Sequence, residues 1–342
     1  MTSMTEPRHS TIRRVAVHVP ELRQTGEEIE DDIRSRNPGV RLQPGLLRQM
    51  YGFQERRVAP ADTWPSDLAA AAARSLLDEC GLRSDAVDLL IFASASEDLE
   101  EPATAHIVAD KLGIAAPVFD VQNACNGFLN ALEIADALIG TGCYSRVLIV
   151  TGERGSTLSH LPARDRDELA LLLPALTLGD LGAALLVEAS NRPGLLGVGW
   201  CTNSAGWRAA TVTNPYFSPG AQPPFVRFDS QALAASFTGM EKFCIAKLAE
   251  WGHNPDDLDL VCLHQASVPF TQAILESTGL AQGKTMATFP RYGNVATASL
   301  PLQLVKATQE NRLQPGDLVA FLGLASGASA GMLLMEWHPD AA

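Results

Sequence analysis

The chain has 342 residues, of which 46% are apolar and 6% aromatic, so it can bury one large core or the cores of two ordinary domains. Its formal net charge of −13 argues against a nucleic-acid-binding surface, because neutralising phosphates requires clustered Lys and Arg. The arginine pairs Arg13–Arg14 and Arg56–Arg57 are predicted to be solvated surface side chains.

The N-terminal segment does not have the pattern of a targeting signal. Arg8, Arg13 and Arg14 are not followed by the apolar run of a signal peptide, and no later stretch has the length of a membrane span. We therefore expect a cytoplasmic protein. The six cysteines are scattered without a CxxC pair, which predicts neither a metal site nor a disulfide framework.

The chain contains an internal repeat, half a chain length apart. Residues 80–96 and 251–267 share a glycine, two aspartates at matching positions, an apolar run and a final Ala-Ser pair. Such a repeat predicts two similar halves. We place them at residues 1–190 and 191–342.

Six apolar runs predict β-strands, with helical patterns between them. Continuous apolar runs of this length fit strands that are covered on both faces. The runs are 87–93, 147–151, 183–187, 258–263, 318–322 and 332–337. This alternation predicts an α/β architecture of layered helices and sheets.

Two segments interrupt the alternation. Residues 154–178 have the pattern of an insertion that covers a pocket, and residues 191–228 contain three proline turns typical of a connecting loop. We expect apolar walls of the pocket to come from 154–178 and from loops within 200–225.

Cys125 follows a strand-like segment and precedes a helix whose apolar spacing continues to Thr141-Gly142. The free N–H groups and the dipole at a helix N-terminus favour a thiolate and can bind an oxyanion. Cys125 is therefore a candidate nucleophile. A small residue that fills a tight turn explains the same local sequence.

His264 and Asn294 are candidate partners of Cys125. His264 follows the run 258–263, and strand carboxyl ends carry ligands and chemistry in open α/β sheets, although a structural histidine also fits there. The repeat places Ala93 at the matching position, which favours a function for the imidazole. Asn294 matches the position beside Cys125, but alone it would be a turn residue or a cap. A cysteine, an imidazole acid/base and an amide donor suit thioester chemistry.

The run Gly327-Ala-Ser-Ala-Gly331 matches the GxSxG motif of hydrolases. Too few residues follow it to supply the acid and histidine that such a hydrolase needs, so we reject this interpretation. Residues 323–327 are instead predicted to form a loop that exposes backbone N–H groups.

Four ordered motifs resemble the ketoacyl synthase III (FabH-like) branch of the thiolase superfamily over nearly the whole chain after residue 12. They are Phe119-Asp120…Ala124-Cys125, Gly179-Asp180…Gly182-Ala-Ala, His264-Gln-Ala and Tyr292-Gly-Asn294. The resemblance implies a five-layered αβαβα thiolase fold of two pseudo-symmetric halves, with the cysteine in the first half and the histidine and asparagine in the second. It implies an acyltransferase with an acyl-Cys125 intermediate, no cofactor, and CoA or phosphopantetheine thioesters as substrates.

Within this branch, residues 99–105, 119–125, 175–179 and 322–327 are most similar to OleA-type enzymes, which join two acyl-CoA chains by a Claisen condensation without decarboxylation. This resemblance implies a homodimer in which Glu101 reaches the partner's site as the base. It also implies an oxyanion hole formed by the backbone N–H groups of Cys125 and Ser326. On sequence alone, Glu101 is an exposed acidic loop residue.

Three residues depart from housekeeping ketoacyl synthase III enzymes. Leu46 and Met50 stand where that group presents a tryptophan and an arginine to the nucleotide, and Pro269 stands where it has an arginine near the carrier protein. We therefore expect CoA or carrier protein to dock differently.

The sequence thus predicts condensation of two acyl thioesters, carried by CoA or acyl-carrier protein, to a β-keto acyl product. Two alternatives remain open: decarboxylative condensation with a malonyl thioester, for which Glu101 is dispensable, and acyl transfer to an alcohol or amine. The presence of Cys125, His264 and Asn294 disfavours a non-catalytic subunit of a heterodimer.

Overall fold

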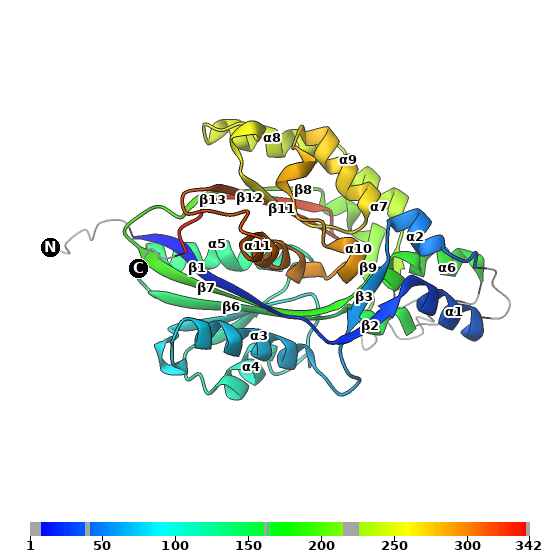
Figure 1. The fold of residues 1–342 in the computed structure, drawn as a ribbon, viewed down its shortest axis with the longest axis horizontal. Coiled ribbons are helices and arrows are strands. Elements are labelled where there is room, and N and C mark those ends of the chain that lie inside the picture. Colours follow the sequence, from blue (N-terminus) through cyan, green and yellow to red (C-terminus); the bar gives the residue numbers. More distant parts are fainter. Residues whose placement is uncertain (1–7, 38–41, 161–162, 164, 215–225, 340–342) are drawn as a thin grey trace.

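The computed structural model describes residues 8–37, 42–160, 163, 165–214 and 226–339, and it has a mixed α/β fold around two β-sheets (Figure 1). The first sheet has the strand order β1-β7-β6-β4-β5, and the second has the order β11-β12-β13-β8. The first contains β1 (His9–His18), β4 (Leu89–Ala93), β5 (Val118–Val121), β6 (Arg146–Arg154) and β7 (Asp180–Ser190). The second contains β8 (Leu195–Thr202), β11 (Leu260–Leu263), β12 (Leu318–Ala325) and β13 (Ser329–Glu336).

The two sheets share one strand topology. In the first sheet β4 runs parallel to β6, and the pairs β6–β7 and β7–β1 are antiparallel. In the second sheet β11 runs parallel to β12, and the pairs β12–β13 and β13–β8 are antiparallel. The order β1-β7-β6-β4 therefore recurs as β8-β13-β12-β11. Strand β5 extends the first sheet as an edge strand.

Three groups of helices cover the sheets (Figure 1). Helices α3 (Pro65–Glu79) and α4 (Thr104–Leu112) lie on the outer face of the first sheet. Helices α5 (Gly127–Gly140) and α11 (Ser299–Gln309) lie between the sheets, and α8 (Met240–Glu250) and α9 (Val268–Thr278) lie on the outer face of the second. Helices and sheets thus alternate through the molecule.

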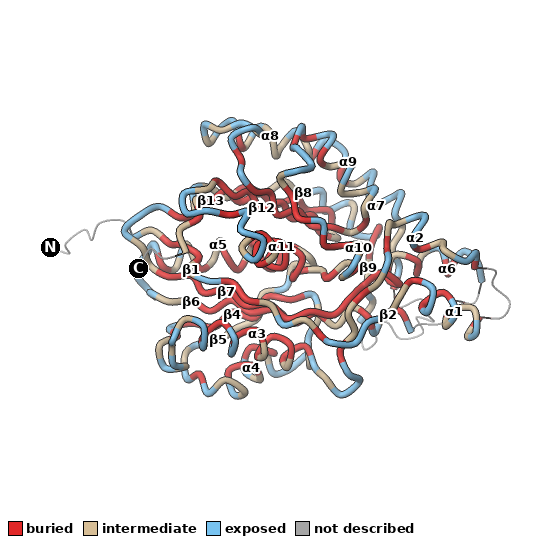
Figure 2. Tube along the Cα trace, viewed as in Figure 1, coloured by how far each residue is buried: buried red, intermediate tan, exposed pale blue. Residues whose placement is uncertain are grey.

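The apolar cores follow this arrangement. The central cluster joins side chains of both sheets with those of α5 and α11, and Phe128 of α5 meets Phe321 of β12 with ring centroids 6.0 Å apart. Separate clusters lie beneath α3 and α4 and beneath α8 and α9. Figure 2 shows the sheets and the helices between them as largely buried. Apolar burial is the main force that holds such layers together.

A smaller group of elements lies at one end of the sheets (Figure 1). The described part of 154–178 contains α6 and short 3₁₀ turns, and it packs in one apolar cluster with α1 and α2. These elements are β2 (Leu22–Thr25), α1 (Gly26–Arg36), α2 (Leu46–Tyr51), β3 (Glu55–Val58), α6 (Arg166–Leu172), β9 (Ala210–Val212), β10 (Val226–Phe228), α7 (Ser230–Ser236) and α10 (Phe289–Tyr292).

The six predicted strands are present, but two expectations from sequence are wrong. Within 191–228, residues Leu195–Thr202 form strand β8, and β9 pairs with β10. The glycines of β8 hide the strand pattern; a Cβ on Gly197 would lie 2.4 Å from Trp251, so the glycine admits the indole at the end of α8. Residues 215–225 lie outside the described part.

The predicted loop at 323–327 is also mostly strand. Residues up to Ala325 belong to β12, and only 326–328 form the turn to β13. Among the helices of the described ranges, none has both the length and the apolar character needed to span a bilayer.

Candidate active site

Cys125 lies in the tight connection between β5 and α5. Helix α5 begins at Gly127, two residues later, so the cysteine stands at the helix start as the sequence predicts. The chain turns sharply there: Asn126 N–H donates to Asn123 O (3.0 Å) and Gly127 N–H donates to Ala124 O (3.2 Å). The helix axis and the turn together fix the direction of the Cys125 side chain.

The thiol of Cys125 is neutral at pH 7. Although the residue as a whole keeps intermediate exposure, burial and, to a smaller extent, the nearby Glu153 carboxylate together raise the pKa of its thiol to about 12. The helix start favours a thiolate, whereas burial of the thiol opposes it. Formation of a nucleophilic thiolate requires a base.

His264 follows the last residue of β11 and is 4% exposed. Its backbone N–H donates to Leu322 O (2.8 Å), which holds it at the end of the second sheet. Burial lowers the pKa of its imidazole to about 4, and a backbone hydrogen bond with Ala296 opposes this shift. Within the described part of the chain, Nδ1 is buried and has no hydrogen-bond partner. The neutral ring offers one proton donor and one acceptor.

Asn294 is fixed by its backbone, which leaves its side-chain amide available. Its N–H donates to Thr177 O (2.9 Å), and its carbonyl accepts from Gly179 N–H (3.0 Å). Its Oδ1 accepts from Ala296 N–H (2.9 Å). The Nδ2 group makes no hydrogen bond with another described residue, so it can donate to a ligand.

The short segment 294–297 brings the three candidates together. Asn294 begins it, Ala296 interacts with His264, and the Thr297 hydroxyl donates to the carbonyl of Ala124, which precedes Cys125 (3.2 Å). Side chains from the ends of both sheets thus meet around one loop.

Ser326 lies in the β12–β13 turn, which is tied to the residue after Cys125. Buried Asn126 donates through Nδ2 to Ser329 O (3.1 Å) and to Ser329 Oγ (2.9 Å), three residues beyond Ser326. The Ser326 N–H donates no hydrogen bond to another described residue. The turn therefore carries a free backbone donor and is anchored to the start of α5.

The backbone is strained in the three loops of the site, namely the Cys125 turn, the 294–297 segment and the β12–β13 turn. Of the four non-glycine residues with positive φ in the described ranges, three lie here: Ala124 (44°), Ala296 (43°) and Ala328 (49°). The left-handed region costs a residue with a Cβ about 1 kcal/mol or more, and such strain clusters at functional sites. The clustering supports these loops as the active site.

Glu101 is not part of this group within one chain. It is exposed on the loop before α4 and makes no hydrogen bond or ion pair with another described residue. The carboxylate of Asp120 in β5 accepts from the N–H groups of Thr104 (2.7 Å) and Ala105 (2.8 Å), which begin α4. The helix start that follows the Glu101 loop is therefore bonded to the edge strand β5.

The prediction that Arg56 and Arg57 are solvated surface side chains is wrong for Arg56, which is completely buried. It donates to Gln24 Oε1, to Ser159 Oγ (2.8 Å) and to the carbonyls of Leu176 (3.3 Å) and Leu178 (2.8 Å). Burial lowers its pKa to about 10, so it stays charged at neutral pH. The two carbonyls flank Thr177, the backbone partner of Asn294, and Arg56 thus supports the Asn294 loop.

Sequence reasoning also missed Glu153 and Thr297, which link the site loops. The one available signal was the charged pair Glu153-Arg154, one glycine after the apolar run 147–151.

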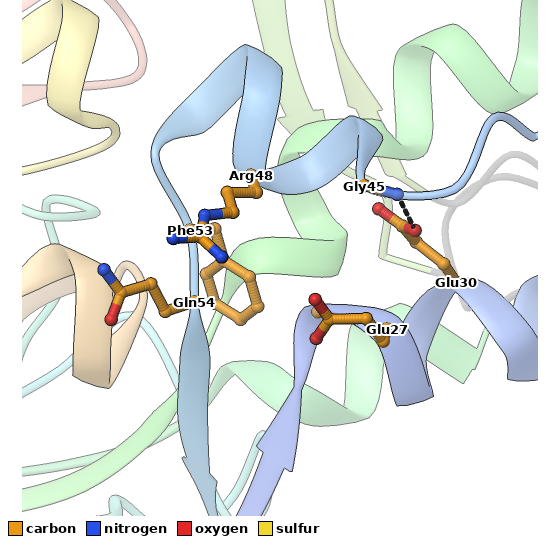
Figure 3. Close-up of a pocket in the computed structure, with 7 residues that line it drawn as sticks. Glu27, Glu30, Gly45, Arg48, Phe53 and Gln54 are labelled. Carbon is orange, nitrogen blue, oxygen red and sulfur yellow. Dashed lines mark hydrogen bonds between the residues drawn. The ribbon is translucent and has the colours of Figure 1, made fainter.

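A separate cavity of about 170 Å³ lies between α1, α2 and the start of β3 (Figure 3). Its polar side chains are Glu27, Glu30, Arg48 and Gln54, and Glu30 accepts from Gly45 N–H (2.6 Å). Phe53 separates the cavity from the Asn294 turn, since a Cβ on Gly293 would lie 3.2 Å from its ring. The cavity therefore lies near the site, but its lining includes no residue of the Cys125 turn, the 294–297 segment or the β12–β13 turn.

Two family models match the chain. Residues 119–204 match 3-oxoacyl-[acyl-carrier-protein (ACP)] synthase III, and residues 248–337 match the C-terminal part of the same family. The first range includes Cys125, and the second includes His264 and Asn294.

A relative and two solved structures resemble this chain over nearly its whole length. An acyl-CoA:acyl-CoA alkyltransferase of Xanthomonas campestris pv. campestris is 32% identical over 322 residues, which cover 92% of this chain and 94% of that protein. A crystal structure of an X. campestris OleA variant with bound lauric acid and lauroyl-CoA matches with a TM-score of 0.86, at 27% identity, over 96% of this chain and 99% of that one. The 3-oxoacyl-(acyl carrier protein) synthase III, FabH, of Xanthomonas oryzae pv. oryzae matches with a TM-score of 0.85, at 27% identity, over 97% and 99%.

Proposed function

The chain belongs to the 3-oxoacyl-[acyl-carrier-protein] synthase III family of condensing acyltransferases, and on this premise we propose that it joins two acyl thioesters through an acyl-Cys125 intermediate. The observation that carries the proposal is the 294–297 segment, which connects the Cys125 turn, His264 and Asn294. We further infer that the two sheets belong to the five-layered αβαβα thiolase arrangement, with pseudo-symmetric halves at 1–190 and 191–342. The shared strand topology supports this division.

The first half-reaction acylates Cys125. The neutral imidazole of His264 accepts the thiol proton, and the thiolate sulfur attacks the thioester carbon. The N–H groups of Cys125 and Ser326 hold the tetrahedral oxyanion. The carbon–sulfur bond to CoA or to the carrier then breaks, and the leaving thiolate takes the proton from His264. A free Ser326 N–H and a neutral imidazole support these roles.

The second half-reaction forms the carbon–carbon bond. A base removes an α-proton from the second acyl thioester, and the resulting enolate carbon attacks acyl-Cys125. His264 and the Asn294 amide donate hydrogen bonds to the enolate oxygen. The carbon–sulfur bond to Cys125 breaks, and the departing thiolate takes up the proton that the base removed. The product is a β-keto acyl thioester. The free Nδ2 of Asn294 supports its assignment as a donor.

We propose Glu101 of a second copy as this base. Glu101 is exposed in the loop before α4, whose first residues are bonded to the edge strand β5, and an exposed sheet edge can pair with another chain. Leu99, in the same loop, is 42% exposed. A homodimer that covers this edge would bring Glu101 toward the partner's site.

The substrates are proposed to be acyl-CoA or acyl-carrier-protein thioesters. The named activity of the alkyltransferase relative favours acyl-CoA for both. Met50 of α2 is 46% exposed and Pro269 of α9 is also exposed, on helices that contact each other. Neither residue can pair with a phosphate, so nucleotide or carrier docking is proposed to rely on other side chains.

The test is to mix the purified protein with myristoyl-CoA alone, and then with malonyl-CoA added, while following Cys125 acylation by intact mass and the products by mass spectrometry. A β-keto product of two myristoyl chains without CO₂ release, lost in Glu101→Ala but retained in Glu276→Ala on the exposed face of α9, supports the proposal.

Two other outcomes would replace it. Product only with malonyl-CoA, unaffected by Glu101→Ala, would assign decarboxylative synthesis, the activity that the matched family is named for. Acylation of Cys125 without condensation would favour transfer to an alcohol or amine.

A further inference from the structure

Glu153 is a buried carboxylate in the centre of the site that the proposed mechanism does not use. It is the next-to-last residue of β6 and is 2% exposed. Its Oε1 accepts from the N–H groups of Ala95 (2.9 Å) and Thr297 (3.3 Å), and its Oε2 accepts from Ser96 Oγ (2.9 Å). The side chain thus joins the end of β4, its own strand and the 294–297 segment.

The N–H groups of Ala95 and Thr297 can only donate, which suits an ionised carboxylate, while the Ser96 hydroxyl can donate or accept. Burial raises the pKa of Glu153, while the hydrogen bonds from Ala95, Thr297 and Ser96 lower it. Two N–H groups converge on Oε1, and on this geometry we take Glu153 as a carboxylate at neutral pH, even though burial leaves its pKa above the ordinary value.

Other charged side chains on the surrounding elements are engaged elsewhere. Arg154, the next residue of β6, pairs with Asp180 of β7 (Nε to Oδ2, 3.6 Å). Burial, together with the nearby Glu100 and Asp120 carboxylates, raises the pKa of Glu97, which follows β4. His264 at the end of β11 is neutral. No cation offsets the charge of Glu153 within the described part of the chain.

Glu153 acts on Cys125 by two routes. Its negative charge disfavours a second negative charge on the thiol. Its bond to Thr297 N–H also orients the residue whose hydroxyl holds Ala124 O, directly before Cys125 (3.2 Å). One side chain therefore affects both the ionisation and the position of the nucleophile.

We propose that Glu153 is a positioning residue that clamps the 294–297 segment against the Cys125 turn, where its carboxylate disfavours ionisation of the Cys125 thiol. The inference rests on the proposed function only in taking Cys125 as the nucleophile. A neutral thiol resists oxidation and alkylation, because both require thiolate. The site therefore stays protected in the absence of substrate.

The test follows alkylation of Cys125 by iodoacetamide between pH 6 and 11, with peptide mass spectrometry to separate it from the exposed Cys143. In Glu153→Gln, which keeps the shape and an acceptor oxygen, the alkylation rate should rise about tenfold at each pH from 8 to 10, as expected if the pKa of the thiol falls by about one unit. Glu276→Gln is the matched control. An unchanged profile in folded Glu153→Gln would overturn the inference.

The wild-type protein provides a test that does not depend on the variant's folding. Its Cys125 alkylation midpoint should lie above pH 9, and a midpoint near or below 8.5 would overturn the inference. Failure of the proposed function is distinguishable, because alkylation needs no condensation. Glu153→Asp keeps the charge but shortens the reach to Thr297; it should alkylate with the wild-type midpoint and acylate from myristoyl-CoA about tenfold more slowly.

Discussion

The hydroxyl of Thr297 donates a hydrogen bond to the carbonyl of Ala124, across 3.2 Å and 173 residues of sequence. Thr297 is fully buried in a 3₁₀ turn that follows Asn294, and Ala124 is the strained residue before Cys125. This bond fixes the loop of the second sheet to the nucleophile turn of the first. The position of Asn294 relative to Cys125 depends on it.

Thr297→Val should slow acylation of Cys125 about tenfold with little loss of folded protein. Valine has the shape of threonine but leaves the Ala124 carbonyl without its donor, a loss of about 1 kcal/mol or more. The acylation rate of Cys125 is measured by quenching the reaction at successive times and detecting the acylated protein by intact mass. Thr308→Val, which removes a hydroxyl bonded within α11, is the control and should acylate at the wild-type rate.

Stability should fall as the pH is lowered, because of His264. Its pKa is about 4 in the folded protein and near 6.5 in the unfolded chain, so the unfolded chain binds a proton first. The stability present above pH 6.5 is lost progressively toward pH 4, by about 2 kcal/mol at pH 5. Urea unfolding at pH 5 and 7.5 measures this. In His264→Gln the pH difference should shrink by that amount, and an identical difference would contradict the assignment.

Arg56→Ala should cost about 3–5 kcal/mol of unfolding free energy, because it removes several buried hydrogen bonds and leaves the carbonyls of Leu176 and Leu178 unpaired. Arg57→Ala is the matched control; Arg57 donates only to the Pro20 and Glu21 carbonyls and should cost about 1 kcal/mol or less. Chemical denaturation compares the two. Equal effects would show that burial of Arg56 does not matter to the fold.

Gly152→Ala should destabilise the protein by about 3 kcal/mol or more. A Cβ at this position in β6 would lie 1.8 Å from the carbonyl oxygen of Pro65, at the start of α3. Gly283→Ala meets no atom within 4 Å and should be nearly neutral. Thermal unfolding of both variants checks this, and a stable Gly152→Ala would mean that α3 can move away from the sheet.

Local sequence patterns determined the strands, the helix start at Cys125 and the order of the three site candidates. Continuous apolar runs specify buried strands because each residue of such a run must be covered. The internal repeat placed Asn294 beside Cys125, and the apolar run 258–263 placed His264 at a strand end. Strand β8 escaped detection because its glycines make room for side chains far away in sequence, Gly197 for Trp251 and Gly199 for Lys247 and Phe243.

Only the tertiary structure decided how charges are buried. Arg56 and Glu153 are ordinary charged residues in the sequence, yet both are buried and hold the site loops through bonds to residues more than 50 positions away. The same burial makes Cys125 a neutral thiol and His264 a neutral imidazole. Desolvation depends on everything that surrounds a group in space, and a linear pattern of residues carries no record of those surroundings.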